Sequence, residues 1–238
     1  MKPMPPTVNP VIVKICGLST EETLDAALAA GADMVGFVFF AKSPRAVSAG
    51  QAASLAARAR GRAEIVALTV DMDDEALAGI VATVQPDWLQ LHGSESASRV
   101  AEVRARFGIP VLKAIGIREK ADLAGLSAYA DVADRLLLDA KPPRGAVLPG
   151  GNGVPFDWRL LDALDPGLSY MLSGGLDAGN VATALALTRP SGIDTSSGVE
   201  SAPGKKDPER IRAFIAAIRG FRPNPEPGRT ISGERISS

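Results

Sequence analysis

The sequence predicts an α/β protein with a single catalytic domain, a (β/α)8 barrel whose closed parallel sheet is surrounded by outer helices. Short apolar runs alternate strictly with Ala-rich helical stretches, eight of each, which favours parallel strands joined by right-handed crossovers. The chain length of 238 residues is also close to the roughly 250 residues that are typical of a single (β/α)8 barrel. A doubly wound open sheet is the alternative. It usually carries a Gly-rich turn after its first strand, and the turn at residues 17–20 lacks that fingerprint.

The strands are expected where short apolar runs occur, and the helices lie between them. The first helix should begin at Thr20, a capping residue, and stop at Gly31. The predicted strands cover residues 11–16, 34–39, 65–70, 88–91, 111–115, 136–139, 170–173 and 192–194. The later helices are expected over residues 48–60, 74–84, 95–107, 120–129, 157–164, 178–187 and 208–218.

The barrel is expected over residues 11–220, with a short extension before it and a tail after it. Residues 1–10 are rich in proline and lack the apolar core of a signal peptide. Residues 221–238 are rich in proline and charge without an apolar period, so we expect a disordered C-terminal tail.

Composition excludes several classes of function. The formal charge is −1, from 26 basic and 27 acidic residues, which suggests neither a nucleic-acid nor a membrane partner. One cysteine cannot form an internal disulfide, and one cysteine with one histidine cannot supply a zinc cluster. No apolar run approaches the roughly 20 residues of a membrane span. We therefore expect a cytoplasmic protein without a metal.

Two strand ends carry candidate chemistry. Cys16 ends the first predicted strand and Asp139 ends the sixth. In a barrel these ends open on one face, so a thiol and a carboxyl there form a candidate base and acid pair. Free cysteine is also often a small buried hydrophobe. Lys14, two residues earlier, either lowers the thiol pKa or is a structural lysine paired with Asp194. His92 is left outside the acid and base roles, because a lone histidine usually makes a structural hydrogen bond.

Glycine-bearing loops after the seventh and eighth strands predict a phosphate site. Loops in these positions of a barrel commonly bind phosphate through backbone amides, although Gly and Ser also favour ordinary turns. The candidate phosphate-binding residues are Gly174, Gly175, Ser196, Ser197 and Gly198.

Two further loops have open interpretations. Gly150-Gly151-Asn152-Gly153 is either a lid over the substrate or a long surface loop. Arg45, in Lys42-Ser43-Pro44-Arg45, can present a planar fork to a carboxylate, whereas most loop arginines are simply solvated.

A series of short motifs runs in order from about Val11 to Ile218. They are Lys14-Ile15-Cys16-Gly17, Gly36-Phe37-Val38-Phe39, Lys42-Ser43-Pro44-Arg45, Gln90-Leu91-His92-Gly93, Leu138-Asp139, Gly150-Gly151-Asn152-Gly153, Phe156-Asp157-Trp158, Ser173-Gly174-Gly175-Leu176 and Asp194-Thr195-Ser196-Ser197-Gly198-Val199-Glu200. With these motifs the chain closely resembles the phosphoribosylanthranilate isomerase family of tryptophan biosynthesis. Asn152 and Thr195 depart from the usual residues, which are threonine or serine and valine.

The resemblance implies a TIM-barrel enzyme that uses no cofactor or metal. It implies that Asp139 is the general acid, that Cys16 is the general base in an internal Amadori rearrangement, and that Arg45 binds the anthranilate carboxylate. The Gly174-Gly175 and Ser196-Ser197-Gly198 loops would then bind the phosphate of a small-molecule substrate.

Three other functions compete with this reading. A histidine-pathway isomerase resembles the architecture but carries an aspartate where Cys16 stands, and a lyase of the tryptophan pathway needs other strand-end residues. A non-catalytic phosphate-binding protein would not need both Cys16 and Asp139. The sequence is compatible with a monomer or a homodimer.

Overall fold

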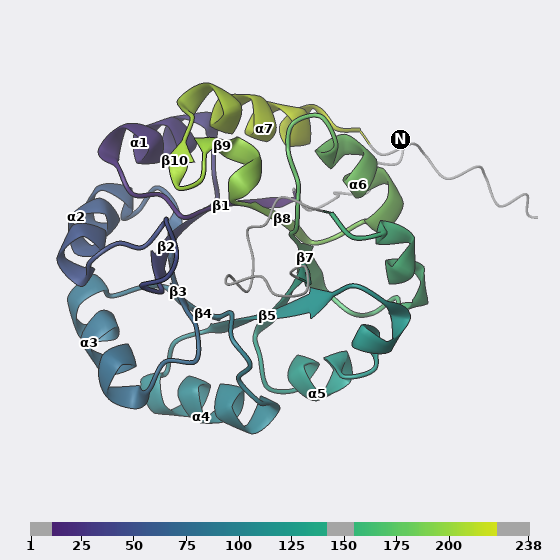
Figure 1. Cartoon of the computed structure of the whole chain (residues 1–238), viewed down its shortest axis with the longest axis horizontal. Coiled ribbons are helices and arrows are strands. Elements are labelled where there is room, and N and C mark those ends of the chain that lie inside the picture. The colour runs from purple at the N-terminus through teal and green to yellow at the C-terminus, as the bar shows by residue number, and fades with distance from the viewer. Residues whose placement is uncertain (1–10, 142–154, 223–238) are drawn as a thin grey trace, which may run out of the picture.

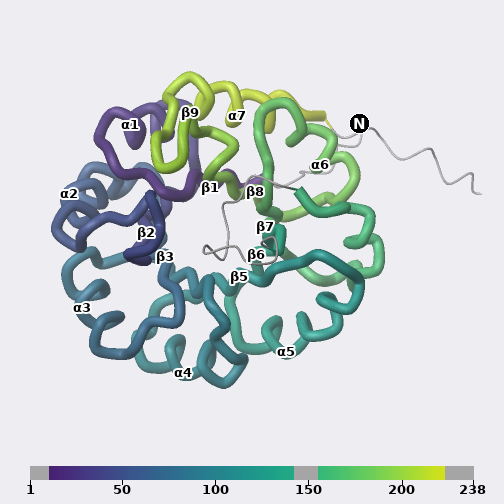
Figure 2. The backbone as a smooth tube through the Cα atoms, in the orientation of Figure 1, coloured from purple at the N-terminus to yellow at the C-terminus, as the bar shows by residue number. Residues whose placement is uncertain are grey.

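The computed structural model describes residues 11–141 and 155–222. Their eight parallel strands close into a barrel in the order β1 to β8, with β8 pairing back to β1 through Lys14 and Asp194. Helices surround the strands, and the first and last of them lie side by side (Figure 1). Figure 2 shows the backbone forming one ring around the central strands. The predicted (β/α)8 fold is therefore confirmed. The extension over residues 1–10, the Gly150–Gly153 loop and the tail from residue 223 lie outside the described residues.

The strands follow the apolar runs to within two residues at either end. They are β1 (Ile12–Cys16), β2 (Met34–Phe39), β3 (Glu64–Thr69), β4 (Trp88–Leu91), β5 (Val111–Ile117), β6 (Arg135–Ala140), β7 (Tyr170–Leu172) and β8 (Gly192–Thr195).

The first four α-helices begin where polar residues cap them. Thr20, Ser48, Asp73 and Ser96 each accept a hydrogen bond from a backbone N–H in the first turn, and Gly31 ends the first helix in a left-handed conformation. The α-helices are α1 (Glu21–Ala30), α2 (Ala49–Ala59), α3 (Asp74–Val84), α4 (Ala97–Phe107), α5 (Leu126–Ala130), α6 (Val181–Thr188) and α7 (Pro208–Gly220).

The fourth helix starts two residues later than expected. Ser96 caps it, so Glu95 lies before the helix and its side chain has another use. The Glu95 carboxylate pairs with the buried ammonium of Lys113 at 2.6 Å and accepts the backbone N–H groups of Asp71 and Gly93.

Two of the predicted α-helices are wrong, because 3-10 helix forms in part of one segment and in most of the other. Residues 120–129 divide into a 3-10 turn, η1 (Lys120–Leu123), and the short α5, with Gly125 between them. Residues 157–164 form a 3-10 helix, η2 (Trp158–Ala163), in which Leu161 is the one buried side chain. Trp158, Leu160 and Leu164 pack against the core but are only partly buried, so few fully buried contacts favour a longer α-helix there.

A small hairpin after β8 was not expected. It joins β9 (Glu200–Ala202) to β10 (Lys205–Lys206) and follows a 3-10 turn, η3 (Ser197–Val199). Pro203-Gly204 is the sequence signal that was overlooked, because this dipeptide typically marks a turn. The hairpin is important because both of its strands carry charged residues of the site described below.

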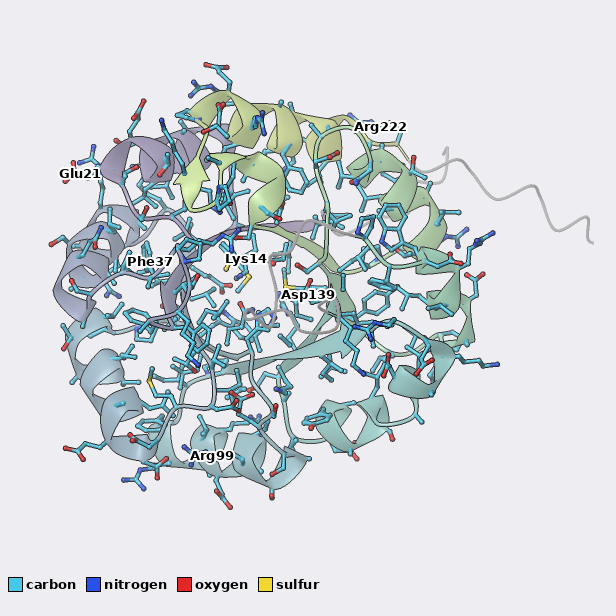
Figure 3. The ribbon with its side chains drawn as sticks, in the orientation of Figure 1. Lys14, Glu21, Phe37, Arg99, Asp139 and Arg222 are labelled. Carbon is cyan, nitrogen blue, oxygen red and sulfur yellow. The ribbon has the colours of Figure 1, made fainter. Side chains whose placement is uncertain are left out.

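The barrel interior changes character along its axis. An apolar cluster of alternating strand residues, including Met34, Leu112 and Met171, fills the N-terminal part, while Cys16, Val38 and Leu68 cluster near the strand ends. Lys14 and Asp139 lie toward the centre of the ring, whereas Glu21 and Arg99 lie at its rim (Figure 3). None of the described helices is long and apolar enough to cross a membrane.

Candidate active site

A pocket of about 650 Å³, counted with the solvent space at its mouth, opens at the C-terminal ends of the strands. Cys16 at the end of β1 and Asp139 near the end of β6 both line it. Of the other predicted site residues, those lining this pocket are Arg45, Gly174, Gly175, Ser196 and Ser197. The fold thus gathers residues far apart in sequence around one cavity.

Lys14 pairs with Asp194 beneath this pocket. Its ammonium is 0% exposed and lies 2.6 Å from Asp194 Oδ1, while the Ser173 hydroxyl donates to Asp194 Oδ2 at 2.9 Å. Burial alone would lower the pKa of Lys14, but the charges of Asp194 and Cys16 and the hydrogen bonds with them together outweigh burial, and the pKa is raised. Lys14 is therefore a fixed cation beside Cys16.

The Cys16 thiol is 4% exposed, and burial raises its pKa above the ordinary value. The charges of Lys14 and Lys206 act in the opposite direction, while the charge of Asp194 adds to the rise. Both alternatives for Lys14 apply in part, since it pairs with Asp194 and also acts to lower the pKa of the Cys16 thiol, but desolvation of the thiol outweighs the cation. Gly36 allows this crowding, since a Cβ there would lie 3.1 Å from Cys16 Sγ and 3.3 Å from Lys14 Nζ.

Asp139 is held by two hydrogen bonds in the described residues. Its Oδ1 accepts the backbone N–H of Ala140 at 2.8 Å, and its Oδ2 lies 3.2 Å from His92 Nε2. The other ring nitrogen, Nδ1, lies 3.0 Å from Gln90 Nε2. His92 was set aside on sequence, and the structure places it against the candidate acid. The available signal was the Gln90-Leu91-His92 spacing, which puts both polar residues on one side of β4.

Arg45 contacts a buried acid. Its Nε donates to Glu200 Oε1 at 2.7 Å and its Nη2 to Oε2 at 2.9 Å, so the planar fork predicted for a ligand carboxylate holds Glu200. Lys206 Nζ lies 2.6 Å from Glu200 Oε1 and donates to the carbonyl of Ser196 at 2.9 Å. Glu200 and Lys206 were missed because their hairpin was not expected.

This cluster should make folding sensitive to acid. Burial would raise the pKa of Glu200, but hydrogen bonds from Arg45 and the charge of Lys206 outweigh it and lower the pKa. A lowered carboxylate pKa stabilises the fold at neutral pH, and this stabilisation is lost as pH falls through the folded-state value. Glu200→Gln should therefore lower the free energy of unfolding by about 3 kcal/mol at pH 7 in urea titrations.

The difference between wild type and Glu200→Gln should shrink as the pH is lowered below the ordinary glutamate range. Glu209→Gln is a matched control on the surface, where the Glu209 side chain is 82% exposed, and it should change stability little at any pH. An equal difference between wild type and Glu200→Gln at pH 7 and in acid would exclude the ionised Glu200 as its source.

The loops after β7 and β8 are bound to each other. Gly174 and Gly175 have φ values of +92° and +64°, and a Cβ on Gly174 would lie 2.5 Å from the backbone nitrogen of Ala140. Thr195 Oγ1 donates to the carbonyl of Leu176 at 2.7 Å, which ties the two loops together. Gly174 and Gly175 thus bring the backbone to the pocket wall in a conformation that other residues rarely adopt.

The second loop is only partly at the pocket. The Ser196 hydroxyl donates to the carbonyl of Cys16 at 3.1 Å and contacts Lys206. Gly198 is not among the residues that line the cavity, and a Cβ on it would collide with the carbonyl of Leu176. The glycine at this position is explained by close packing between the loops.

The sequence also matches a known family profile. The profile of N-(5′-phosphoribosyl)anthranilate isomerase aligns with residues 13–217. The chain belongs to this family. A family member from Rhodopseudomonas palustris (strain BisA53), named N-(5′-phosphoribosyl)anthranilate isomerase, is 64% identical over 210 residues, which are 88% of this chain and 96% of that protein.

Solved structures of phosphoribosylanthranilate isomerases have the same fold. The crystal structure of the enzyme from Thermotoga maritima is 36% identical, with a TM-score of 0.80 over 89% of this chain and 100% of that one. A second isomerase structure, 33% identical with a TM-score of 0.75, covers 89% and 100% of the two chains. That isomerase was crystallised in complex with reduced 1-(o-carboxyphenylamino)-1-deoxyribulose 5-phosphate.

Proposed function

We propose that this chain is the aldose-ketose isomerase of tryptophan biosynthesis that converts N-(5-phosphoribosyl)anthranilate to 1-(2-carboxyphenylamino)-1-deoxyribulose 5-phosphate. The observation that carries the assignment is the placement of Cys16 and Asp139 in one pocket, from β1 and β6. An internal Amadori rearrangement needs one acid and one base acting on the same sugar. Membership of the isomerase family supports the same reaction.

The first half of the reaction is assigned to Asp139. Its protonated carboxyl donates to the ribose ring oxygen, and the C1′–O bond breaks as the anthranilate nitrogen supplies its lone pair to C1′. The product of this step is an open-chain Schiff base with a new hydroxyl. The hydrogen bond from the Ala140 N–H holds Oδ1, so the proton resides on Oδ2, beside His92 Nε2, and passes from there to the ring oxygen of the substrate.

The second half is assigned to Cys16. Its thiolate removes the proton from C2′, and the electrons of the broken C–H bond move toward the nitrogen to form an enolamine. Tautomerisation then gives the ketone, so the product has the same composition as the substrate. Lys14, held by Asp194 at 2.6 Å, is the cation that favours the thiolate.

Binding is assigned to the rim of the pocket. The backbone at Gly174 and Gly175, with Ser196 and Ser197, is proposed to receive the phosphate, as both loops line the cavity. Gly198 is proposed to support this site through its packing against Leu176. Arg45 is proposed to receive the anthranilate carboxylate beside Glu200. The enzyme is proposed to act in the cytoplasm as a monomer or a homodimer.

Arg45→Ala should raise KM for phosphoribosylanthranilate by about 10- to 100-fold, the loss expected for a charge-assisted pair, with a smaller change in kcat. Steady-state kinetics measure both constants. Lys42→Ala, an exposed change in the same loop, is the matched control and should leave KM unchanged. A substrate analogue without the ring carboxylate should bind both variants alike. An unchanged KM in Arg45→Ala would remove the arginine from substrate binding.

The assignment is tested by incubating the purified chain with phosphoribosylanthranilate, generated in the reaction mixture because it is labile, while following loss of its fluorescence. Wild type should consume the substrate, and chromatography should identify the ribulose product. Binding of phosphoribosylanthranilate without turnover would indicate a non-catalytic phosphate-binding protein instead. Turnover of the histidine-pathway aminoribonucleotide instead would assign the other isomerase.

A further inference from the structure

Three polar side chains form a row into the pocket. Gln90 and His92 come from alternate positions at the end of β4, and Asp139 comes from β6. Gln90 Nε2 lies 3.0 Å from His92 Nδ1, and His92 Nε2 lies 3.2 Å from Asp139 Oδ2. Gln90 is completely buried, and His92 is the single histidine of the chain.

The buried amide of Gln90 is half satisfied. Its nitrogen donates to His92 Nδ1, while its oxygen, Oε1, is buried and has no hydrogen-bond partner in the part of the chain that the structure describes. A buried carbonyl without a partner is costly, so such an atom needs an explanation. Rotating the amide by half a turn places Oε1 against Nδ1 and leaves the nitrogen without this bond. Each orientation makes one bond to the ring, so the proton on Nδ1 decides between them.

The two orientations correspond to two proton arrangements. When the Gln90 nitrogen faces Nδ1, the ring proton is on Nε2, and it is donated to the ionised carboxylate of Asp139. When Oε1 faces Nδ1, that nitrogen carries the ring proton and Nε2 accepts the hydroxyl proton of a protonated Asp139. The second arrangement holds one proton more, and that proton is on Asp139.

We propose that Gln90 is a positioning residue for the acid, and that its amide turns as Asp139 gains and loses its proton. His92 then keeps a hydrogen bond to Asp139 in both states, as donor to the carboxylate and as acceptor from the acid. The need for two states rests on the proposed function, in which Asp139 delivers a proton and must recover it. Gln90 acts through His92.

Within residues 11–141 and 155–222, no other charged side chain bonds to a side chain of this row, although Lys113 Nζ, paired with Glu95, donates to the carbonyls of Leu91 and Gly93 on either side of His92. The remaining titratable groups that line the pocket are Cys16, Arg45 and Asp194. Arg45 is bonded to Glu200, and Asp194 to Lys14 and Ser173. Among the described residues, the hydrogen bonds of the Asp139 carboxylate come from His92 and the Ala140 N–H alone. A change in the protonation of Asp139 therefore affects the orientation of the Gln90 amide only through the imidazole ring of His92.

Asp139→Asn provides a mimic of the protonated acid. The Ala140 N–H donates to Oδ1, so the oxygen of an asparagine should stay there and its NH₂ group should take the place of Oδ2. That group can only donate to His92 Nε2, which places the ring proton on Nδ1. Oε1 of Gln90 is then required as the acceptor.

Nitrogen NMR of the untagged protein tests the proposal without substrate, because one labelled histidine gives one set of ring signals. Wild type at neutral pH should show a protonated Nε2 and an unprotonated Nδ1. Asp139→Asn should show the reverse, and adding Gln90→Met, which removes the acceptor, should lower the population with protonated Nδ1. The same ring proton position in wild type and Asp139→Asn, or a reversal unaffected by Gln90→Met, would overturn the proposal.

Steady-state kinetics provide a second test of the positioning role of Gln90. Gln90→Met alone should lower kcat about tenfold with KM within about twofold, a part of the roughly 10²- to 10⁴-fold that a general acid supplies. Gln51→Met, in which an exposed glutamine is changed, is the control and should match wild type. A kcat for Gln90→Met within about twofold of wild type would overturn the positioning role. If wild type itself fails to turn over phosphoribosylanthranilate, the proposed function fails, and the NMR result still decides the amide.

Discussion

Asp139→Asn should lower kcat by about 10²- to 10⁴-fold while changing KM by less than about threefold, the range expected for loss of a positioned general acid. The asparagine has the size of the aspartate and keeps an oxygen for the Ala140 N–H, so the shape of the pocket is preserved. It cannot deliver a proton to the ribose ring oxygen. Because ring opening comes first, no Schiff base forms for the thiolate to act on.

Steady-state turnover of phosphoribosylanthranilate measures this effect. Asp131→Asn, an exposed change on the same domain, is the control and should retain wild-type constants. Circular dichroism and the urea midpoint should confirm that Asp139→Asn is folded. Turnover of Asp139→Asn within severalfold of wild type would remove Asp139 from the acid role.

Cys16→Ala should also lower kcat by about 10²- to 10⁴-fold, since it removes the group assigned to the C2′ proton. Cys16→Ser should be nearly as inactive, because the smaller serine hydroxyl stays un-ionised and is a far weaker base than a thiolate. The pocket and the Lys14–Asp194 pair remain in both variants, so binding of the phosphate should persist. Activity in Cys16→Ala within severalfold of wild type would contradict the base assignment.

The pH dependence of the wild-type enzyme should show the state of this thiol. Burial raises the pKa of Cys16, so at neutral pH the thiolate is the minor form. A base is active when deprotonated, and kcat/KM should therefore rise about tenfold per pH unit above neutrality until the pH reaches the raised pKa. The residual activity of Cys16→Ala should lack this rise.

Chemical modification gives an independent measure, because Cys16 is the only cysteine. Alkylation by iodoacetamide should be slower than that of a free thiol at pH 7 and should accelerate with increasing pH. Fast alkylation at neutral pH, or a flat pH profile of kcat/KM, would show that the thiolate is already the main form.

The barrel was predictable because each strand carries its own signal. The run over residues 34–39 is apolar throughout, as a strand buried on both faces requires, and it matches β2 at both ends. The run over residues 88–91, which is apolar except for Gln90, matches β4 at both ends. Capping residues such as Thr20 and Asp73 mark helix starts through bonds to the adjacent turn. The errors lie where packing decides, as in η2, whose segment offers one buried side chain.

The sequence predicted only those residues of the candidate site that stand at the ends of predicted strands. Cys16 and Asp139 each follow an apolar run, so topology alone brings them to one face of a barrel. Glu200 and Lys206 do not follow an apolar run, so the sequence did not mark them as site residues. A two-stranded hairpin brings them to Arg45, which lies more than 150 positions away in sequence. His92 was visible in the sequence, but its contact with Asp139 depends on how the barrel places β4 and β6 on either side of β5.

The sequence by itself determined the barrel, the order of its strands and the residues that stand at their ends, because apolar periodicity and capping act over a few neighbouring residues. Only the tertiary structure decided the electrostatics. Whether Lys14 makes Cys16 acidic depends on the balance between its charge and burial, and burial prevails. Likewise Arg45 pairs with Glu200, and Gln90 contacts a ring nitrogen of His92 while its amide oxygen has no partner among the residues described. Desolvation and hydrogen bonding arise from groups that are distant in sequence, so these properties follow only from the folded chain.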